Sequence, residues 1–468
     1  MQPEEALLKN FPFEPTPDQA ALFRKLDDFI QNKTNNREVF LLKGFAGTGK
    51  TTVVRALVKI LNSFGYKFVL LAPTGRAAKV MATYTRTPAS TIHKKIYRQA
   101  ANAFSDGLVF NRQPNKLADT IFIVDEASMI SDEKAFGDSG LLQDLIQYVY
   151  EKKNNKLLLI GDTAQLPPVN QSLSPSLDAS YLTGNFRCHV QEIELRQVMR
   201  QAQESGILMN ATNLREQLRQ PEPELKLSTR HYKDIYRMTG EKLEDGLRYA
   251  YDKFGVENTT VICRSNKNAN LYNQHIRRQI FFAEDEIGVG DYLMIVRNNY
   301  FWLAKDSTIG FMANGDFVEI TKIVRYEEMY DFRFADVQIR FVDYPEEPEM
   351  EVKILLDTLY TEAPALPADK SKKLYEEVLK DYSDLGTKKE RTKQLRNNPY
   401  LNALQVKFAY ALTCHKAQGG QWKAVFVDHG FLKEDMVNTE FARWLYTAVT
   451  RSAQELYLLN FNPQLLVD

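Results

Sequence analysis

The chain has 468 residues, 44% of them hydrophobic, which is enough for ordinary cores in about two to four domains. Lysine plus arginine and aspartate plus glutamate each number 60, so net basicity gives no argument for nucleic-acid binding, although a local basic groove would suffice. Three scattered cysteines argue against a disulfide framework and a zinc site, and no apolar run approaches the roughly 20 residues of a membrane span. The sequence therefore predicts a soluble, cytoplasmic protein.

Short apolar strands alternate with helical segments from residue 39 to about residue 160. We expect strands at residues 39–42, 68–72, 120–124 and 157–160. Continuous apolar runs of this kind are typical of parallel strands buried on both faces, so the pattern predicts a doubly wound α/β domain. The alternation lapses between residues 89 and 119, where a small hairpin turning at residues 105–107 is expected.

A second α/β unit begins near Gln191, with strands expected at residues 259–263, 424–428 and 455–459. Residues 287–356 interrupt this unit. Their β-type residues and Gly, Asn and Asp turns predict a small, strongly twisted β-barrel. Residues 366–397 are rich in Lys and Glu and predict a helical protrusion, for which we favour a solvated helix over a dedicated binding arm.

Residues 44–51 read G-F-A-G-T-G-K-T and match the phosphate-binding loop pattern G-x-x-x-x-G-K-[ST]. The loop lies between an expected strand and an expected helix, whose N-terminal N–H groups bind anions. We expect Lys50 to reach the β- and γ-phosphates of ATP and Thr51 to ligate Mg²⁺. The expected nucleotide-binding residues in this loop are Gly44, Gly47, Thr48, Gly49, Lys50, Thr51 and Thr52.

A later expected strand ends in two adjacent carboxylates, Asp125 and Glu126. Asp125 is the expected second side chain for Mg²⁺, and Glu126 is the candidate general base that orients the attacking water. The phosphate-binding loop and this acidic pair occur in the order that nucleotide hydrolases require. Together they predict nucleotide hydrolysis.

Four further residues fit a nucleotide site, each with an alternative. Gln165 can report the γ-phosphate through its amide, or can belong to a proline-terminated loop. Arg200 and Arg451 can neutralise transition-state charge, or can be surface arginines on amphipathic helices. Gln19 can read an adenine edge, or can be a surface residue behind an N-cap threonine.

The ordered motifs resemble those of superfamily 1 helicases, and within them the RecD-like and Dda-like branch. The similar segments cover nearly the whole chain: Gln19, residues 44–51, 71–79, 91–94, 124–128, 161–165, 200–201, 413–419 and 446–451. The resemblance implies two RecA-like domains with ATP between them, arginine fingers at Arg200 and Arg451, and Gln165 coupling nucleotide state to DNA. It also implies 5′→3′ translocation on single-stranded DNA.

The resemblance further implies a domain division. The first RecA-like domain would span residues 1–190, with a pin-like hairpin insertion at about 95–118. The second would comprise residues 191–285 and 401–468, with residues 286–400 forming an SH3-like barrel and the charged helical protrusion. Phe104 or Phe110 would be the wedge that splits the duplex, or either would only hold the hairpin on its domain.

The resemblance also implies a path for the single strand, lined by Pro73, Thr74, His93, Thr413, His415 and Lys416. The alternatives are a turn hydroxyl for Thr74 and satisfied core histidines at positions 93 and 415. An aromatic cluster at residues 300–302 can stack on bases, although packing of the barrel is favoured.

The sequence thus predicts an ATP- and Mg²⁺-dependent DNA helicase that acts, as a monomer, on single-stranded DNA and its junction with duplex. Four alternatives stay open: a 3′→5′ helicase of the same superfamily, an RNA helicase, a DNA translocase that does not unwind, and a P-loop switch. RNA is among them because phosphate contacts do not distinguish RNA from DNA.

Overall fold

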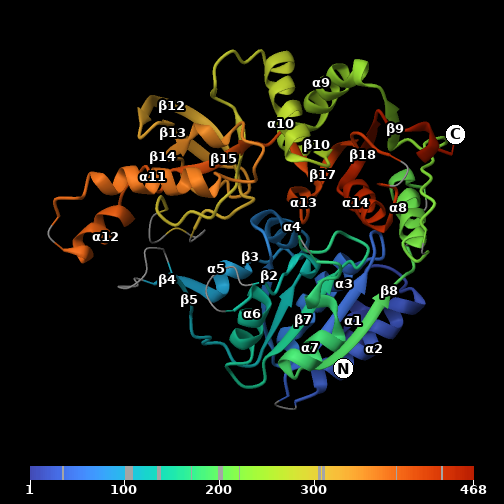
Figure 1. Cartoon of the computed structure of the whole chain (residues 1–468). Coiled ribbons are helices and arrows are strands. Elements are labelled where there is room, and N and C mark those ends of the chain that lie inside the picture. The colour runs from blue at the N-terminus through green and yellow to red at the C-terminus, as the bar shows by residue number, and fades with distance from the viewer. Residues whose placement is uncertain are drawn as a thin grey trace.

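The computed structural model describes residues 1–467 except for residues 34–35, 101–108, 134–138, 170, 199–203, 221, 304–306, 308–310, 386 and 434–435. Two α/β units, each built on a parallel sheet, lie one above the other, and a closed β-barrel stands beside the second unit (Figure 1). This arrangement confirms the predicted α/β fold with a hairpin insertion in the first unit and a barrel in the second. Among the described residues, no helix has the length and apolar character to cross a membrane.

The first unit contains a six-stranded parallel sheet in the order β3-β2-β6-β7-β1-β8. Its central strands are almost completely buried because helices cover both faces, which confirms the strands expected from apolar runs. The strands are β1 (Glu38–Gly44), β2 (Lys67–Ala72), β3 (Ala89–Thr91), β6 (Thr120–Val124), β7 (Lys156–Gly161) and β8 (His189–Leu195). The helices are α1 (Pro3–Asn10), α2 (Pro17–Gln31), α3 (Lys50–Ile60) and α4 (Gly75–Thr85) on one face, and α5 (Ile92–Ile96), α6 (Leu141–Val149) and α7 (Ala179–Phe186) on the other.

The expected boundary of the first unit at residues 190–191 is wrong. Strand β8 pairs with β1 along its whole length, from His189 opposite Glu38 to Leu195 opposite Gly44. It is the edge strand of the first sheet, and Leu195 is its only fully buried residue. The strand therefore lacks the continuous apolar run that marks the central strands.

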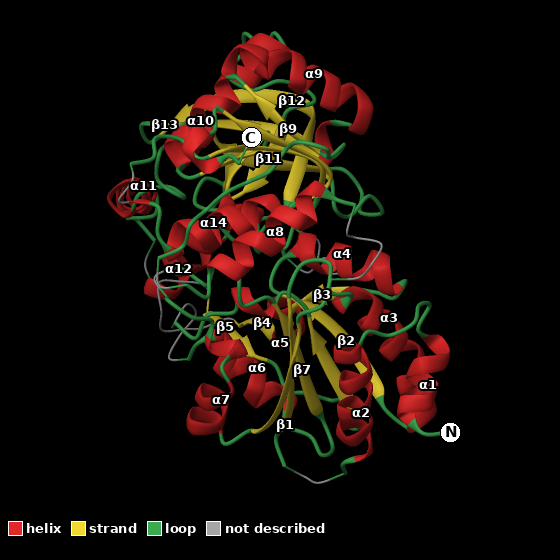
Figure 2. Cartoon of the chain, turned by 90° about the vertical axis from the view of Figure 1, so that its right-hand side faces the viewer, coloured by secondary structure: helices red, strands yellow, loops and turns green. Residues whose placement is uncertain are grey.

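The second unit contains a five-stranded parallel sheet in the order β16-β10-β17-β18-β9. Its strands are β9 (Ile235–Met238), β10 (Thr259–Cys263), β16 (Ala411–Thr413), β17 (Trp422–Asp428) and β18 (Ser452–Leu459). Its helices are α8 (Gly206–Gln217), α9 (Leu243–Phe254), α10 (Asn266–His275), α13 (Cys414–Ala417) and α14 (Thr439–Val449). The three expected strands are confirmed as β10, β17 and β18. Helices α8 and α14 lie between the two sheets, so they face the first unit (Figure 2).

The barrel comprises β11 (Tyr292–Ile295), β12 (Phe317–Met329), β13 (Phe332–Phe341), β14 (Met350–Leu355) and β15 (Leu404–Phe408). Strand β15 closes it by pairing with both β11 and β14. The expected boundary at residues 400–401 is therefore wrong, and the insertion extends to Phe408. The sequence did not reveal this because β15 is a short strand of alternating apolar and polar residues, two residues before the next strand.

The charged segment at residues 366–397 forms α11 (Ala368–Lys380) and α12 (Lys388–Arg396). These helices are not solvated all round. Leu374 and Val378 of α11 and Leu395 of α12 are buried in a cluster with Phe332 and Phe334 of the barrel. The apolar residues at helical spacing thus dock the protrusion on the barrel, while most of its described charged residues are exposed.

The expected hairpin is present as β4 (Tyr97–Ala100) and β5 (Val109–Arg112), which pair antiparallel from Tyr97 opposite Arg112 to Ala100 opposite Val109. It extends from the first unit on the same side as the barrel (Figure 1). Its expected turn and Phe104 lie outside the described residues, and so does the side chain of Phe110. The choice of wedge residue therefore stays a prediction.

Arg76 of α4 joins the first unit to both other parts. Its guanidinium carbon lies 4.2 Å from the ring centroid of Trp422 in the second unit and 4.8 Å from that of Phe317 in the barrel. It also donates hydrogen bonds to the carbonyl oxygens of Glu257 (3.3 Å) and Gln421 (3.4 Å). These cation–π contacts and hydrogen bonds connect the three parts through one partly buried side chain.

Candidate active site

The phosphate-binding loop connects β1 to α3 at the carboxyl edge of the first sheet. Gly47 and Gly49 have φ angles of 75° and 86°, in the left-handed region that glycine adopts without strain. The Lys50 ammonium donates to the carbonyl oxygens of Gly44 (2.6 Å) and Phe45 (2.9 Å), so it lies at the mouth of the loop. The loop opens on a cavity of about 600 Å³ between the two units.

Residues of both units line this cavity. The first unit contributes Thr51, Asp125, Glu126 and Gln165, and the second contributes Arg451. The structure thus brings together at one cavity side chains that are up to 400 residues apart, from Thr51 to Arg451. The predicted Arg200 lies outside the described residues, so its role stays a prediction.

Gln19 is completely buried, so its surface alternative is wrong. Its Oε1 accepts a hydrogen bond from the Thr16 backbone N–H (3.0 Å), and its Nε2 donates to the carbonyl oxygen of Thr48 (3.0 Å). The amide therefore ties the start of α2 to the phosphate-binding loop. Reading of an adenine edge stays a prediction, and the amide has a second N–H and a second lone pair for it.

Asp125 and Glu126 follow β6, as expected. The Asp125 carboxylate accepts hydrogen bonds from the hydroxyl of Tyr84 (2.6 Å) and the backbone N–H of Glu126 (2.9 Å), and burial raises the pKa of Asp125 above its ordinary value. The partner Tyr84 was not predicted, because a single tyrosine on α4 carries no signal in the sequence. The Thr51 hydroxyl and the Asp125 carboxylate are oxygen donors on one cavity, which is the donor set that suits Mg²⁺ beside nucleotide phosphates.

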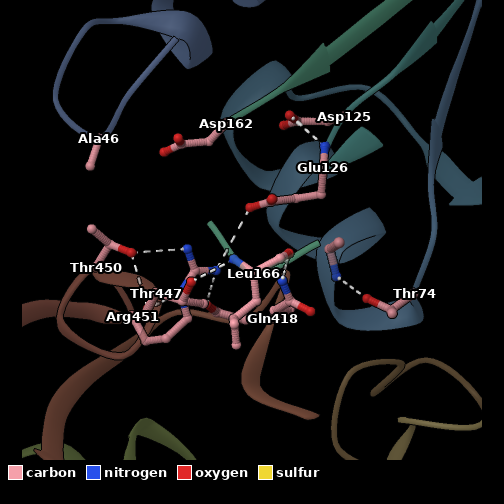
Figure 3. A network of polar contacts seen from close by, with 12 residues as sticks. Ala46, Thr74, Asp125, Glu126, Asp162, Leu166, Gln418, Thr447, Thr450 and Arg451 are labelled. Atoms are coloured by element: carbon pink, nitrogen blue, oxygen red, sulfur yellow. Dashed lines mark hydrogen bonds and ion pairs between the residues drawn. The ribbon is translucent and has the colours of Figure 1, made fainter. Parts of the chain in front are cut away.

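Glu126 faces Arg451 across the boundary between the units (Figure 3). Glu126 Oε1 lies 3.7 Å from Arg451 Nη1, and Arg451 is only 3% exposed, so the surface alternative for this arginine is wrong. The guanidinium is also held by the carbonyl oxygens of Gly420 (3.2 Å) and Thr447 (3.1 Å). A fixed cation from the second unit thus meets the candidate base of the first.

Gln165 is buried at the same cavity. Its side-chain oxygen has no hydrogen-bond partner among the described residues. Buried polar atoms without partners are uncommon in folded proteins, so this amide is available to a ligand. The position agrees with the predicted contact to the γ-phosphate or to the attacking water.

The loop after β7 is held by backbone contacts to the second unit. The Leu166 N–H donates to the Thr447 hydroxyl (2.9 Å), and the Gln418 side-chain amide donates to the Leu166 carbonyl oxygen (2.7 Å; Figure 3). The Arg443 guanidinium donates to the carbonyl oxygen of Gln165 (3.3 Å). Sequence reasoning missed these contacts because no local spacing relates α14 to this loop.

The expected DNA-contacting residues of the first unit follow neighbouring strands. Pro73 and Thr74 come after β2, and His93 comes two residues after β3, so they lie at one edge of the sheet. The Thr74 hydroxyl accepts a hydrogen bond from the Ala77 N–H (3.2 Å) and caps α4, as its alternative stated. Burial lowers the pKa of half-buried His93 to about 4, so its ring is neutral at pH 7.

The expected residues of the second unit lie at the end of β16 and in α13. Thr413 precedes α13, and His415 is exposed, so the core alternative for this histidine is wrong. Lys416 donates to the Asn314 side chain of the barrel (2.6 Å). A Cβ placed on Gly419 would lie 3.2 Å from the Thr74 hydroxyl, so the two sets of residues approach each other across the boundary.

The aromatic cluster at residues 300–302 packs on other residues of the insertion that contains the barrel. Trp302 Nε1 donates to the carbonyl oxygen of Asn402 (2.7 Å), and the Tyr300 ring stacks on Phe311 at 4.6 Å. These contacts agree with the favoured packing interpretation. Base stacking by this cluster stays a prediction.

Comparisons with known proteins agree with this geometry. Residues 17–233 match the AAA domain family, and residues 408–459 match the UvrD-like helicase C-terminal domain. An uncharacterised protein of Acanthamoeba polyphaga mimivirus is 24% identical, covering 92% of this chain and 97% of that protein. The RecD2 DNA helicase of Deinococcus radiodurans is 33% identical over 40% of this chain and 23% of its own length. The Dda helicase of Enterobacteria phage T4 is 23% identical over 54% of this chain and 55% of its own length.

The chain therefore spans less than two thirds of either named helicase that it matches. The two domain matches occur in chain order, one in each α/β unit, and the motifs that they contain meet at the cavity between the units. Together with these relatives, the two domain matches support the resemblance to superfamily 1 helicases of the RecD-like and Dda-like branch.

Proposed function

We propose that this protein is an ATP-dependent DNA helicase that moves 5′→3′ along single-stranded DNA and separates the strands at a junction with duplex. The approach of Arg451 to Glu126, 3.7 Å apart and from different units, carries the proposal. A base and a charge-neutralising group that meet only when the units are together make hydrolysis depend on their relative position. The substrate and the direction are inferred from the resemblance to RecD2 and Dda.

Each of the side chains named at the cavity has a role in the proposed hydrolysis of ATP. Glu126 accepts a proton from the water whose oxygen attacks the γ-phosphorus. The bond between the γ-phosphorus and the oxygen that bridges it to the β-phosphate breaks, and ADP leaves with that oxygen. Lys50 and Arg451 neutralise charge on the transferred phosphoryl group, and Gln165 orients the water. Thr51 and Asp125 would hold Mg²⁺, which would supply further positive charge at the phosphates.

The direction is tested with two matched duplexes, one with a 5′ single-stranded tail and one with a 3′ tail. We expect ATP-dependent strand separation from the 5′ tail only. Separation from the 3′ tail only would keep the helicase and overturn the direction. DNA-stimulated ATP hydrolysis without separation of either duplex would identify a translocase, and an RNA-tailed duplex tests the RNA-helicase alternative. A protein whose ATP hydrolysis DNA does not stimulate would favour the P-loop switch.

DNA affinity is expected to fall as pH rises through 8, because of Lys416. Burial lowers the pKa of Lys416 from its ordinary 10.5 to about 8, so the ammonium is charged at pH 7 and roughly nine-tenths neutral at pH 9. An ammonium has three donors, and Asn314 uses one of them. If Lys416 contacts a DNA phosphate, the Kd for labelled oligothymidine should rise severalfold between pH 7 and pH 9 at fixed ionic strength.

The matched control is Lys416→Arg, which keeps its charge over this pH range. Burial also lowers the pKa of Lys407 to about 8, and this residue is unchanged in the variant. Burial lowers the pKa of Lys156 to about 8 as well, so any pH dependence that the variant retains comes from groups other than residue 416. Identical pH profiles for the wild type and Lys416→Arg would remove Lys416 from the DNA-binding surface.

A further inference from the structure

We propose that Tyr446 is a positioning residue that makes the phosphate-binding loop depend on closure of the two units. The inference rests on the proposed ATPase activity and concerns a side chain that does not line the nucleotide cavity itself. Tyr446 would act on protein groups around the nucleotide, whereas Arg451 would act on the charge of the transferred phosphoryl group.

The Tyr446 hydroxyl joins two elements of the first unit from its place on α14 of the second. It accepts a hydrogen bond from the Ala46 backbone N–H in the phosphate-binding loop (2.9 Å) and donates one to Asp162 Oδ2 (2.6 Å). Tyr446 and Asp162 are each 1% exposed. The other Asp162 oxygen accepts from the Ala164 N–H (2.9 Å) in the loop that leads to Gln165.

Both groups that Tyr446 contacts need a partner. Burial raises the pKa of the Asp162 carboxyl, while the Tyr446 hydroxyl, as one of its hydrogen-bond donors, favours the ionised form. The Ala46 N–H belongs to the loop whose amides bind phosphate, and in this structure its partner comes from the other unit. One hydroxyl therefore links the phosphate-binding loop to the loop carrying Gln165.

The position of Tyr446 on α14 connects this link to the arginine. Arg443, Tyr446 and Thr447 are spaced three and four residues apart, so they lie on one face of the helix and contact the same part of the first unit. Arg451 comes two residues after the end of the same helix. When α14 moves away from the first unit, Ala46 and Asp162 must lose the hydroxyl as Arg451 leaves Glu126. The position of α14 thus sets both the geometry of the phosphate-binding loop and the distance of the Arg451 charge from the phosphates.

The test replaces Tyr446 with phenylalanine, which keeps the buried ring and removes only the hydroxyl. We expect the DNA-stimulated kcat for ATP hydrolysis to fall about tenfold, while the Kd for fluorescent mant-ADP changes less than about twofold. Tyr457→Phe is the matched control, because this buried hydroxyl donates to Glu455 within the second unit (2.6 Å) and makes no contact across the boundary in the described structure. Its kcat should equal that of the wild type.

A double-mutant cycle with Asp162→Asn separates positioning from simple loss of stability. If Tyr446 acts through Asp162, the double variant should lose about as much kcat as the more damaged single variant. Wild-type kcat in Tyr446→Phe overturns the inference, and so do strictly additive losses or a parallel loss of mant-ADP affinity and Tm. A wild-type protein that does not hydrolyse ATP overturns the proposed function instead.

Discussion

Replacing Glu126 with glutamine is expected to lower the DNA-stimulated kcat for ATP hydrolysis by about 10²–10⁴-fold, the usual contribution of a general base. Glutamine has nearly the same shape but cannot accept a proton from the attacking water. ATP binding should be retained, because the loop glycines, Lys50 and Thr51 are unchanged. Phosphate release measures the turnover, and the affinity for a fluorescent ATP analogue measures the binding.

The matched control is Glu319→Gln, which removes a carboxylate paired with Arg340 on the barrel surface, where Glu319 is 33% exposed. This variant should hydrolyse ATP like the wild type. DNA-stimulated hydrolysis close to normal in Glu126→Gln would contradict the general-base assignment. The proton would then have to be accepted by another group at the cavity.

Replacing Arg451 with alanine is expected to lower kcat by about 10³-fold or more, the range measured for arginine fingers. The loss follows from removing a positive charge that is 3% exposed and is fixed by carbonyl oxygens before the reaction begins. Single-strand affinity should be largely kept, because the expected DNA-contacting residues lie elsewhere. Steady-state hydrolysis and fluorescence anisotropy with labelled oligothymidine measure the two quantities.

Two further variants make this result interpretable. Arg451→Lys keeps the charge but lacks the planar fork of donors, so it should recover only part of the turnover. Arg340→Ala removes a half-exposed arginine of the barrel and should leave both quantities unchanged. Affinity for DNA that falls in proportion to turnover in Arg451→Ala would indicate misfolding and would contradict the assignment.

The fold was predictable where burial leaves a local pattern. Strands β1, β2, β6 and β7 are visible as apolar runs because both faces of their sheet are covered. Strand β8 was missed because an edge strand that is half exposed has no such run. Strand β15 was missed for another reason, since its five residues alternate apolar with polar side chains, and such a short pattern does not reveal which sheet or barrel a strand joins.

The candidate site was likewise predictable only where its residues lie close together in the sequence. The phosphate-binding loop and the acidic pair are recognisable because their spacing is local. The contacts of Tyr84 with Asp125 and of Tyr446 with Ala46 join residues 41 and 400 positions apart, which no spacing along the chain encodes. The contacts of Gln19 were predictable only in part, because its capping contact with Thr16 is local in the sequence and its hydrogen bond to Thr48 is not.

The attachment of the barrel has a mechanical consequence. Only Ala409 and Tyr410 separate β15, which closes the barrel, from β16, which ends at Thr413. The Tyr410 hydroxyl bonds Asp291 (3.0 Å) and the Tyr292 N–H (3.1 Å), while its carbonyl oxygen accepts from Val261 in the sheet (3.0 Å). This short connection is hydrogen-bonded to the barrel on one side and to the sheet on the other. We therefore expect it to allow little rotation of the barrel relative to the sheet. A torque applied to the barrel by a strand of DNA would therefore reach the residues before Thr413 directly.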